Sequence, residues 1–324
     1  MTHSAPNLDA ITQLRASLAH DIVRTPLMRC AGLESLLDDG SMVYGKLEFL
    51  QRTGTFKARG ALAVIRGLSR EQLAAGVTAV SAGNHAIATA FAAKAAGTSA
   101  KVVMIASANA YRINACRSYG ADVVLADDAH TAFEMAERIK QQEGRFFVHP
   151  FDGEAIATGT GTVGLEICEQ CDNFDAVVVS VGGGGLIGGI GNAVKQLRPA
   201  CEVIGVETNG ADSMHRSLEA GEPVSIDRVD TIADSLGAPF ALPYSFELCQ
   251  RYVDRMAMVS DLNLQQTMGL LFKHMKLAVE PACAASTAAL LGPLRELLRG
   301  KRIVLVFCGS NIDWDTYSKL AILN

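Results

Sequence analysis

Short apolar runs alternate with longer amphipathic stretches along most of this chain. The apolar runs predict strands at 42–47, 77–80, 101–105, 122–125, 146–148, 176–181, 203–206 and 303–307. Stretches with helical periodicity predict helices at 7–18, 58–68, 86–96, 110–119, 129–142, 186–197, 211–220, 262–277 and 282–298. Unbroken apolar strands that alternate with helices are typical of mostly parallel sheets covered by helices. The pattern therefore predicts an α/β protein with open sheets.

Composition supports this fold class and bounds its size. The 324 residues are 49% hydrophobic and only 6% aromatic, and they include 30 glycines. This profile suits an α/β enzyme with alanine-rich helices and tight turns between strands and helices. No linker rich in proline, glycine or serine marks a domain boundary, so two sheets of this length must belong to interleaved or tightly packed domains.

Charge and cysteine usage exclude several classes of protein. The net charge of −5, without a basic block, argues against a nucleic-acid partner. The first ten residues lack the pattern of a signal peptide, and no apolar run is long enough to span a membrane. The eight cysteines show no spacing typical of a disulfide framework. We expect a soluble cytoplasmic protein.

The first candidate for chemistry is Lys57, which follows the turn Thr53-Gly54-Thr55-Phe56 and opens a predicted helix. Between Phe56 and an apolar helix the lysine amine would be desolvated, which lowers its pKa and makes it a nucleophile. The alternative is a solvated surface lysine, because lysines are rarely buried. The other loops decide between the two.

A second loop, Ser81-Ala82-Gly83-Asn84-His85, lies between a short strand and an alanine-rich helix. Small residues leave the first N–H groups of the helix uncovered, and these groups can bind a carboxylate. Ser81, Asn84 and His85 add side-chain hydrogen bonds at the same place. The alternative is an ordinary helix cap with an incidental histidine.

A third loop, Gly182-Gly183-Gly184-Gly185-Leu186, follows a strand and opens a helix. Consecutive exposed N–H groups at a helix N-terminus bind phosphate. A merely tight turn would need only one or two glycines. The stretch Gly183–Gly188 also fits G-x-G-x-x-G, with Glu207 at the spacing of a dinucleotide site. This motif alone does not separate a dinucleotide from a simple phosphate ester.

A fourth loop, Cys308-Gly309-Ser310-Asn311, lies at the carboxyl end of the last predicted strand, where ligands of open α/β sheets gather. Cys308 could bond a ligand heteroatom, act as a nucleophile, or simply be buried. No neighbour in sequence looks like a base that would activate its thiol.

A desolvated lysine, a phosphate-binding loop and a carboxylate-binding loop together indicate pyridoxal phosphate. From about Thr25 to Asn311 the chain resembles the serine/threonine dehydratase and serine racemase group of fold-type II pyridoxal-phosphate enzymes. The resemblance rests jointly on Thr-Gly-Thr-Phe-Lys (53–57), Ser-Ala-Gly-Asn-His (81–85), Gly-Gly-Gly-Gly-Leu (182–186), Thr-Ile-Ala-Asp (231–234) and Glu-Pro (280–281).

The resemblance implies two interleaved open-sheet α/β domains of the tryptophan synthase β-like kind, with the cofactor in the cleft between them. Residues 1–68 plus 150–324 would form the large cofactor-binding domain, and residues 69–149 would form a small domain inserted in it. The group also implies a homodimer. Because the resemblance extends almost to the end of the chain, feedback control by isoleucine is not expected.

The resemblance also implies a role for each site residue. Lys57 would bind pyridoxal phosphate covalently and then take the substrate α-proton. The other cofactor-binding residues would be Phe56 beside the ring, Asn84 at the 3′-oxygen, Gly182, Gly183, Gly184, Gly185 and Leu186 at the phosphate, together with Glu280 and Cys308. The substrate carboxylate would lie on Ser81, Ala82, Gly83, Asn84 and His85. The implied reaction is elimination of water from a β-hydroxy amino acid to give a 2-oxo acid and ammonia.

Four positions depart from the group. Cys308 replaces a frequent serine at the pyridine nitrogen, and a thiol is a weak hydrogen-bonding group. Ala82 replaces the serine that the racemase uses as an acid/base, so racemisation is disfavoured. Ser235 replaces a common glycine, and the next residues, 236–240, are expected to reshape the substrate pocket. Ser213 stands where a second carboxylate would join Glu207 at a divalent-ion site, so no metal is expected.

L-Threonine and L-serine are the default substrates, and 3-hydroxyaspartate or a phenylserine is the alternative. Racemisation or β-replacement with the same cofactor are rival reactions. An NAD-dependent dehydrogenase is the more remote alternative, since it leaves Lys57 and the loop at 81–85 unexplained. A non-catalytic binding protein is a third class. A visible absorption band from a lysine-bound cofactor would separate these classes.

Overall fold

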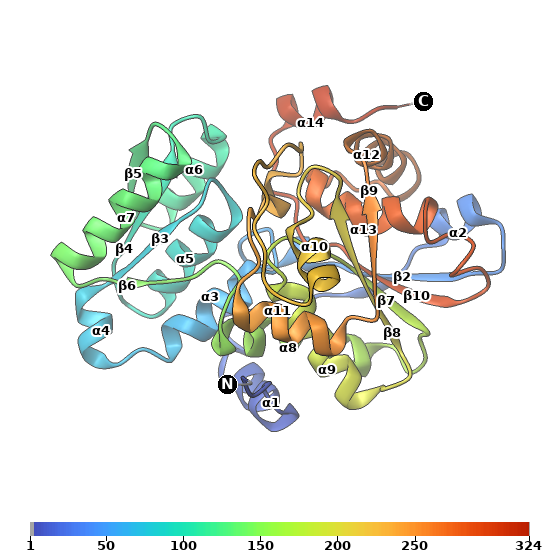
Figure 1. Ribbon diagram of the computed structural model, residues 1–324, viewed down its shortest axis with the longest axis horizontal. Helices are drawn as coiled ribbons and strands as arrows, with labels where there is room; N and C mark the ends of the chain where they lie inside the picture. The colour runs from blue at the N-terminus through green and yellow to red at the C-terminus, as the bar shows by residue number, and fades with distance from the viewer. Residues whose placement is uncertain (1–2, 324) are drawn as a thin grey trace.

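The computed structural model describes residues 3–323, and its strands form two separate sheets (Figure 1). The larger sheet has the order β1-β2-β10-β7-β8-β9, with β1 (Leu27–Arg29), β2 (Met42–Lys46), β7 (Ala176–Ser180), β8 (Glu202–Thr208), β9 (Arg255–Val259) and β10 (Arg302–Val306). Its strands are parallel except for the β1–β2 pair. The smaller sheet is parallel throughout, in the order β5-β4-β3-β6, with β3 (Val77–Val80), β4 (Ala100–Ile105), β5 (Asp122–Ala126) and β6 (Phe146–Phe147). The predicted α/β class with open parallel sheets is confirmed.

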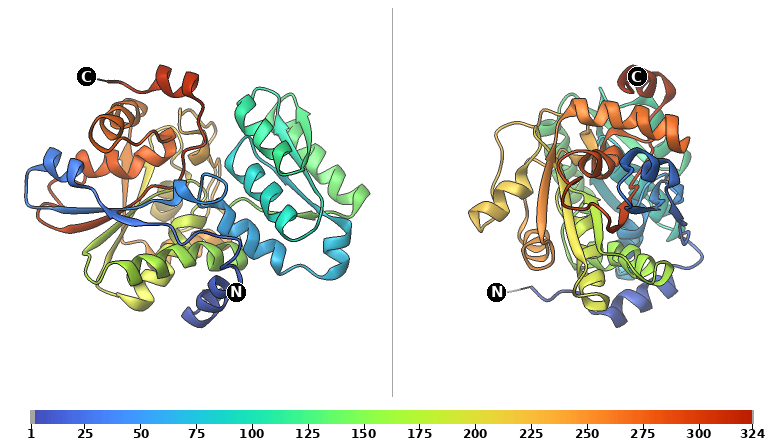
Figure 2. Two further views of the ribbon diagram at one scale, coloured as in Figure 1. Left: turned by 180° about the vertical axis from the view of Figure 1, so that it is seen from behind. Right: turned by 90° about the vertical axis from the view of Figure 1, so that its right-hand side faces the viewer.

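Helices cover both sheets, as unbroken apolar strands require. Around the larger sheet lie α1 (Leu8–Ser17), α2 (Ala31–Leu37), α8 (Glu154–Gln170), α9 (Gly185–Leu197), α10 (Ser213–Ala220), α11 (Pro243–Tyr252), α12 (Asp261–Met275), α13 (Pro281–Leu291) and α14 (Trp314–Leu320). Around the smaller sheet lie α4 (Arg70–Ala75), α5 (Asn84–Ala95), α6 (Ala110–Ser118) and α7 (Ala129–Glu143). Helix α3 (Lys57–Arg66) contacts both α5 and α8, so it joins the two parts of the molecule (Figure 2).

Every strand of the smaller sheet lies between Val77 and Phe147, while the chain before and after supplies the larger sheet. We propose on this basis that residues 69–149 form a small domain inserted into a large one made by residues 1–68 and 150–324. Met1, Thr2 and Asn324 of this division lie outside the described residues.

Two parts of the predicted element pattern need correction. The helix expected at 282–298 ends at Leu291, because Gly292 and Pro293 interrupt it and a series of turns follows. The pattern also missed the two edge strands β1 and β9 and the helices α2, α4, α11 and α14. Among the described residues no helix is long and apolar enough to cross a membrane.

A buried network of charges fixes α3 to the larger sheet. Lys46 on β2 donates to Glu166 Oε2 on α8 at 2.5 Å. Arg59 on α3 donates to Glu166 Oε1 at 2.8 Å and to Glu48 Oε2 at 2.8 Å. All four side chains are almost completely buried, so two cations and two carboxylates balance one another away from water. Because Arg59 lies two positions after Lys57, this network holds the start of α3 in place.

We expect Glu166→Gln to lower the free energy of unfolding by about 3–5 kcal/mol, because it leaves two buried cations facing one carboxylate. Urea unfolding followed by circular dichroism measures this change. The control is Glu296→Gln, which removes an exposed partner of Arg299 and should cost about 1 kcal/mol or less. Similar small shifts for both variants would contradict the assigned importance of the network.

Candidate active site

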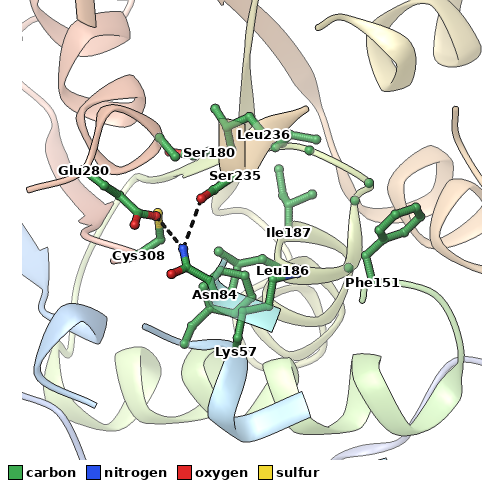
Figure 3. Close-up of a pocket in the computed structure, with 17 residues that line it drawn as sticks. Lys57, Asn84, Phe151, Ser180, Leu186, Ile187, Ser235, Leu236, Glu280 and Cys308 are labelled. Carbon is green, nitrogen blue, oxygen red and sulfur yellow. Dashed lines mark hydrogen bonds between the residues drawn. The ribbon is translucent and has the colours of Figure 1, made fainter. Parts of the chain in front are cut away.

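A pocket opens at the carboxyl ends of β7 and β10, where the loops singled out in the sequence meet (Figure 3). About 470 Å³ of space free of protein atoms lies in and over it, open solvent included, and its position at the strand ends is where open α/β sheets bind ligands. Its lining residues are Phe56, Lys57, Asn84, Phe151, Ser180, Val181, Gly182, Gly183, Gly184, Gly185, Leu186, Ile187, Ser235, Leu236, Glu280, Ala282 and Cys308.

The turn before Lys57 is bonded to the loop that follows β10. Phe56 N donates to Cys308 O at 3.1 Å, and Ser310 N donates to Gly54 O at 3.1 Å. Gly54 has a φ of +73°, and a Cβ at this position would overlap the side-chain oxygen of Asn311. A glycine is therefore needed for both the backbone conformation and the close approach. These contacts place the start of α3 beside Cys308.

Lys57 is desolvated, as the sequence predicted. Its Nζ donates to Pro150 O at 2.6 Å and lies 5.2 Å from the centre of the Phe56 ring. Burial lowers the pKa of Lys57 to about 8. A substantial fraction of this amine is therefore neutral near physiological pH, as a nucleophile or a base requires.

The lowered pKa predicts how cofactor attachment depends on pH. Since only the neutral amine attacks an aldehyde, the rate of covalent pyridoxal phosphate uptake by the apoprotein should rise about tenfold per pH unit below pH 8. Above the pKa of about 8 the rate should level off. Stopped-flow recording of the visible absorption measures the profile. A profile that continues to rise to the ordinary pKa of lysine would contradict the desolvation.

The loop at 81–85 contributes chiefly Asn84 to the pocket. Asn84 Nδ2 donates to Glu280 Oε1 at 2.8 Å and to Ser235 Oγ at 3.1 Å (Figure 3). Its Oδ1 accepts from Asn311 Nδ2 at 2.8 Å. Asn311 Nδ2 also donates to Thr53 O at 2.8 Å. Asn311 thus connects the lysine turn with the start of α5.

The other residues of this loop lie less directly at the pocket. His85 Nε2 is 2.8 Å from Val148 O, and burial lowers the pKa of His85 to about 3, so the ring is neutral. His85 lines a smaller adjoining cavity with Lys57. Ser81, Ala82 and Gly83 do not line the main pocket, and Ser81 Oγ accepts from Gly83 N at 3.1 Å. The backbone N–H groups at the start of α5 are therefore the better candidates for holding a carboxylate.

The four glycines form a close-packed turn between β7 and α9. Gly184 has a φ of +85°. A Cβ on Gly183 would overlap the Phe151 ring, and one on Gly185 would overlap the Phe151 carbonyl oxygen. The first N–H groups of α9 have no partner within the helix, so they are available to bind an anion.

Two polar groups lie at the other side of the pocket. Hydrogen bonding with Cys283, together with burial, raises the pKa of Cys308 well above its usual value, so the thiol stays protonated. This excludes the thiolate nucleophile considered from the sequence. Burial also raises the pKa of Glu280.

These residues fit pyridoxal phosphate. Glu280 Oε2 and Ser180 Oγ are buried, line the pocket and have no hydrogen-bond partner among the described residues. The glycine turn offers N–H groups for a phosphate, the Cys308 thiol can hydrogen-bond a ring nitrogen, and Lys57 offers a reactive amine. Fold and site thus define an α/β protein whose pocket suits this cofactor, with Lys57 as the residue that would bind it covalently.

Comparison with known proteins identifies the family. The family model described as "Pyridoxal-phosphate dependent enzyme" matches residues 18–309, and the chain belongs to this family. It is 51% identical to phenylserine dehydratase of Ralstonia pickettii, over 98% of this chain and 97% of that protein. It is 38% identical to L-threonine ammonia-lyase of Thermotoga maritima, over 94% of this chain and 76% of that protein. The structure of maize serine racemase matches with a TM-score of 0.92 at 30% identity, covering 98% of this chain and 97% of that chain.

The resemblance and the cofactor predicted from the motifs are therefore confirmed, and pyridoxal phosphate replaces the dinucleotide alternative. At the doubtful metal site, Glu207 is buried and accepts from Met214 N at 3.0 Å and His215 N at 2.7 Å. Burial raises the pKa of Glu207 to about 8. Ser213 Oγ donates to Ala238 O at 2.9 Å. In the part of the chain that the structure describes, no group of three or more His, Cys, Asp or Glu could hold a metal ion.

Sequence reasoning missed three residues at or beside the pocket: Phe151, Ser180 and Arg112. Arg112 on α6 is buried; it pairs with Asp234, and its Nε donates to Asn311 O at 2.9 Å. Its Nη2 lies 3.8 Å from Glu280 Oε2. Only the position of Ser180, at the end of a buried strand, was a usable signal; the other two depend on tertiary contacts.

Proposed function

We propose that this protein is a pyridoxal-phosphate-dependent dehydratase that eliminates water from a β-hydroxy amino acid and releases a 2-oxo acid and ammonia. The observation that carries the proposal is the desolvated Lys57 amine between the glycine turn and the neutral Cys308 thiol. The identity to a phenylserine dehydratase and to L-threonine ammonia-lyases supports the same chemistry.

When bound, the cofactor supplies an electron sink that stabilises negative charge at the substrate Cα. The chain's own residues position the cofactor and the substrate, and they move the protons. The glycine turn and the start of α9 hold the phosphate, and the N–H groups at the start of α5 hold the substrate carboxylate. Lys57 takes the α-proton, because its lowered pKa keeps a neutral amine available. Ala82 cannot transfer a proton, which favours elimination over racemisation.

We further propose that the preferred substrate has an aromatic β-substituent. Phenylserine would lose its β-hydroxyl and its amino group to give phenylpyruvate and ammonia. The support is the 51% identity to the Ralstonia pickettii phenylserine dehydratase over nearly the full length of both chains. L-Threonine and L-serine, the default substrates of the group, are the second candidates, since other relatives carry the name L-threonine ammonia-lyase.

The test is 2-oxo acid release by the purified holoenzyme from L-threonine, L-serine, 3-hydroxyaspartate and phenylserine. We expect kcat/KM for phenylserine to exceed that for threonine by about tenfold or more, the scale of discrimination that a matched apolar pocket gives. A yellow protein that releases nothing would move the chemistry to racemisation or replacement. A protein that stays colourless with added pyridoxal phosphate would overturn the proposal.

We also propose that the enzyme is a homodimer and works in the cytoplasm. All eight cysteines are free and buried, which supports a reducing compartment. Size-exclusion chromatography with light scattering tests the assembly.

A further inference from the structure

We propose that His149, Phe151 and Phe240 form the subsite that receives the aromatic β-substituent of the substrate. The inference rests on the proposed dehydratase function and names residues that determine its specificity. None of the three belongs to the motifs that suggested the cofactor. They come from two segments, the chain between β6 and α8 and the chain between α10 and α11.

The three rings form a continuous aromatic surface. The rings of His149 and Phe151 meet edge to face, with centroids 4.7 Å apart and an interplanar angle of 86°. The rings of Phe151 and Phe240 are 6.4 Å apart with an angle of 53°. All three are partly exposed rather than buried in the core. Their spacings lie in the range of favourable aromatic pairs, so an added ring can extend the same arrangement.

This surface adjoins the reactive amine. The carbonyl of Pro150, between His149 and Phe151, accepts the hydrogen bond from Lys57 Nζ at 2.6 Å. The charge of Lys57 also contributes to lowering the pKa of His149, after the larger effect of burial. Phe151 lines the main pocket, and Figure 3 shows it on the side opposite Glu280 and Cys308. Phe151 therefore flanks the glycine turn, away from Cys308, and the rings of His149 and Phe240 join this side through their contacts with the Phe151 ring.

The direction of the substrate follows from its two fixed points. Its carboxylate lies at the loop 81–85 and its Cα faces Lys57 Nζ, so its side chain must extend away from the start of α5. Outside that loop, Lys57 Nζ donates to the carbonyl oxygen of Pro150, which lies between His149 and Phe151 in the chain. A β-phenyl group placed there meets the Phe151 ring and, beyond it, Phe240.

The histidine presents an uncharged ring to this space. Burial lowers the pKa of His149 to about 4, so it is neutral at physiological pH. Its Nδ1 accepts from Phe151 N at 3.3 Å and Asp152 N at 3.0 Å, which fixes the ring and leaves the proton on Nε2. Three uncharged rings suit an aryl group, whereas the second carboxylate of 3-hydroxyaspartate would lose hydration against them.

The experiment compares binding of two amino acids that lack the β-hydroxyl and so cannot lose water. L-Phenylalanine carries the aryl group, and L-2-aminobutyrate carries the side chain of threonine without its hydroxyl. Both are titrated into holoenzyme by calorimetry and by the visible spectrum of the cofactor. In Phe240→Ala we expect the affinity for L-phenylalanine to fall about tenfold, while that for L-2-aminobutyrate changes by less than about twofold.

Two further variants make the result specific. Phe240→Tyr keeps the ring and should retain the affinity for L-phenylalanine. Phe133→Ala removes a phenyl ring that is 51% exposed on α7 and should change neither affinity. Equal losses for both ligands in Phe240→Ala, or no loss for L-phenylalanine, would overturn the subsite.

The outcome is separable from the proposed function. If no β-hydroxy amino acid yields an oxo acid and L-phenylalanine binding still depends on Phe240, the subsite stands and the dehydratase assignment falls. If oxo acid is released from phenylserine with the same preference in Phe240→Ala as in the parent enzyme, the dehydratase stands and the subsite falls.

Discussion

Lys57→Ala is expected to lower kcat for 2-oxo acid release by at least about a thousandfold and to remove the visible absorption band of the covalently bound cofactor. Two functions are lost together, because the same amine attaches the cofactor and takes the substrate α-proton. The remaining pocket, including the glycine turn and Cys308, is unchanged by this substitution. Pyridoxal phosphate should therefore still bind without a covalent bond, so spectrum and affinity are measured separately.

The matched control is Lys94→Ala, which truncates an exposed lysine near the end of α5. It should leave both the spectrum and the rate unchanged. Far-ultraviolet circular dichroism shows whether each variant is folded. A folded Lys57→Ala protein that keeps the visible band, or more than about a tenth of the parental rate, would contradict the assignment, since loss of a catalytic proton-transfer group costs far more.

The fold could be predicted from the sequence where local pattern and tertiary role coincide. All five residues of β7 are buried, and its first four residues, Ala176-Val-Val-Val179, are apolar for the same reason. The lysine turn and the four glycines could be recognised in the sequence because both are unusual at a helix start. A lysine begins one apolar helix, and a run of glycines begins another. Such local exceptions mark sites where function competes with propensity.

The features that could not be predicted from the sequence depend on contacts between residues far apart in the chain. Arg112 looks like a solvated residue of a polar helix, yet Asp234 and the carbonyl of Asn311 bury it between the two parts of the molecule. The sequence predicted that Asn84 would face the cofactor, but not that Glu280 would accept from its amide. Asn84 and Glu280 are 196 residues apart in the chain, so no local pattern in the sequence connects them. The sequence pointed to residues 236–240 as a stretch that shapes the substrate pocket, but not to the contact between the rings of Phe240 and Phe151.

Gly185→Ala is expected to weaken pyridoxal phosphate binding by about ten- to a hundredfold, the effect of forcing one methyl group into a packed site. The added Cβ would overlap the carbonyl oxygen of Phe151 and lie 3.0 Å from its carbonyl carbon. Backbone atoms cannot swing aside as a flexible side chain can, so the glycine turn or the segment at 151 must move. Either movement displaces the N–H groups that bind the phosphate.

The measurement is fluorescence titration of the apoprotein with pyridoxal phosphate. Gly67→Ala is the matched control, since Gly67 lies at the end of α3 with a φ of −85° and a Cβ there would come no closer than 3.4 Å to its neighbours. That variant should bind the cofactor like the parent protein. Unchanged affinity in Gly185→Ala would mean that the phosphate is held elsewhere. Lower affinity together with unchanged thermal stability of the apoprotein would place the effect at the phosphate, because a general packing defect would destabilise the apoprotein as well.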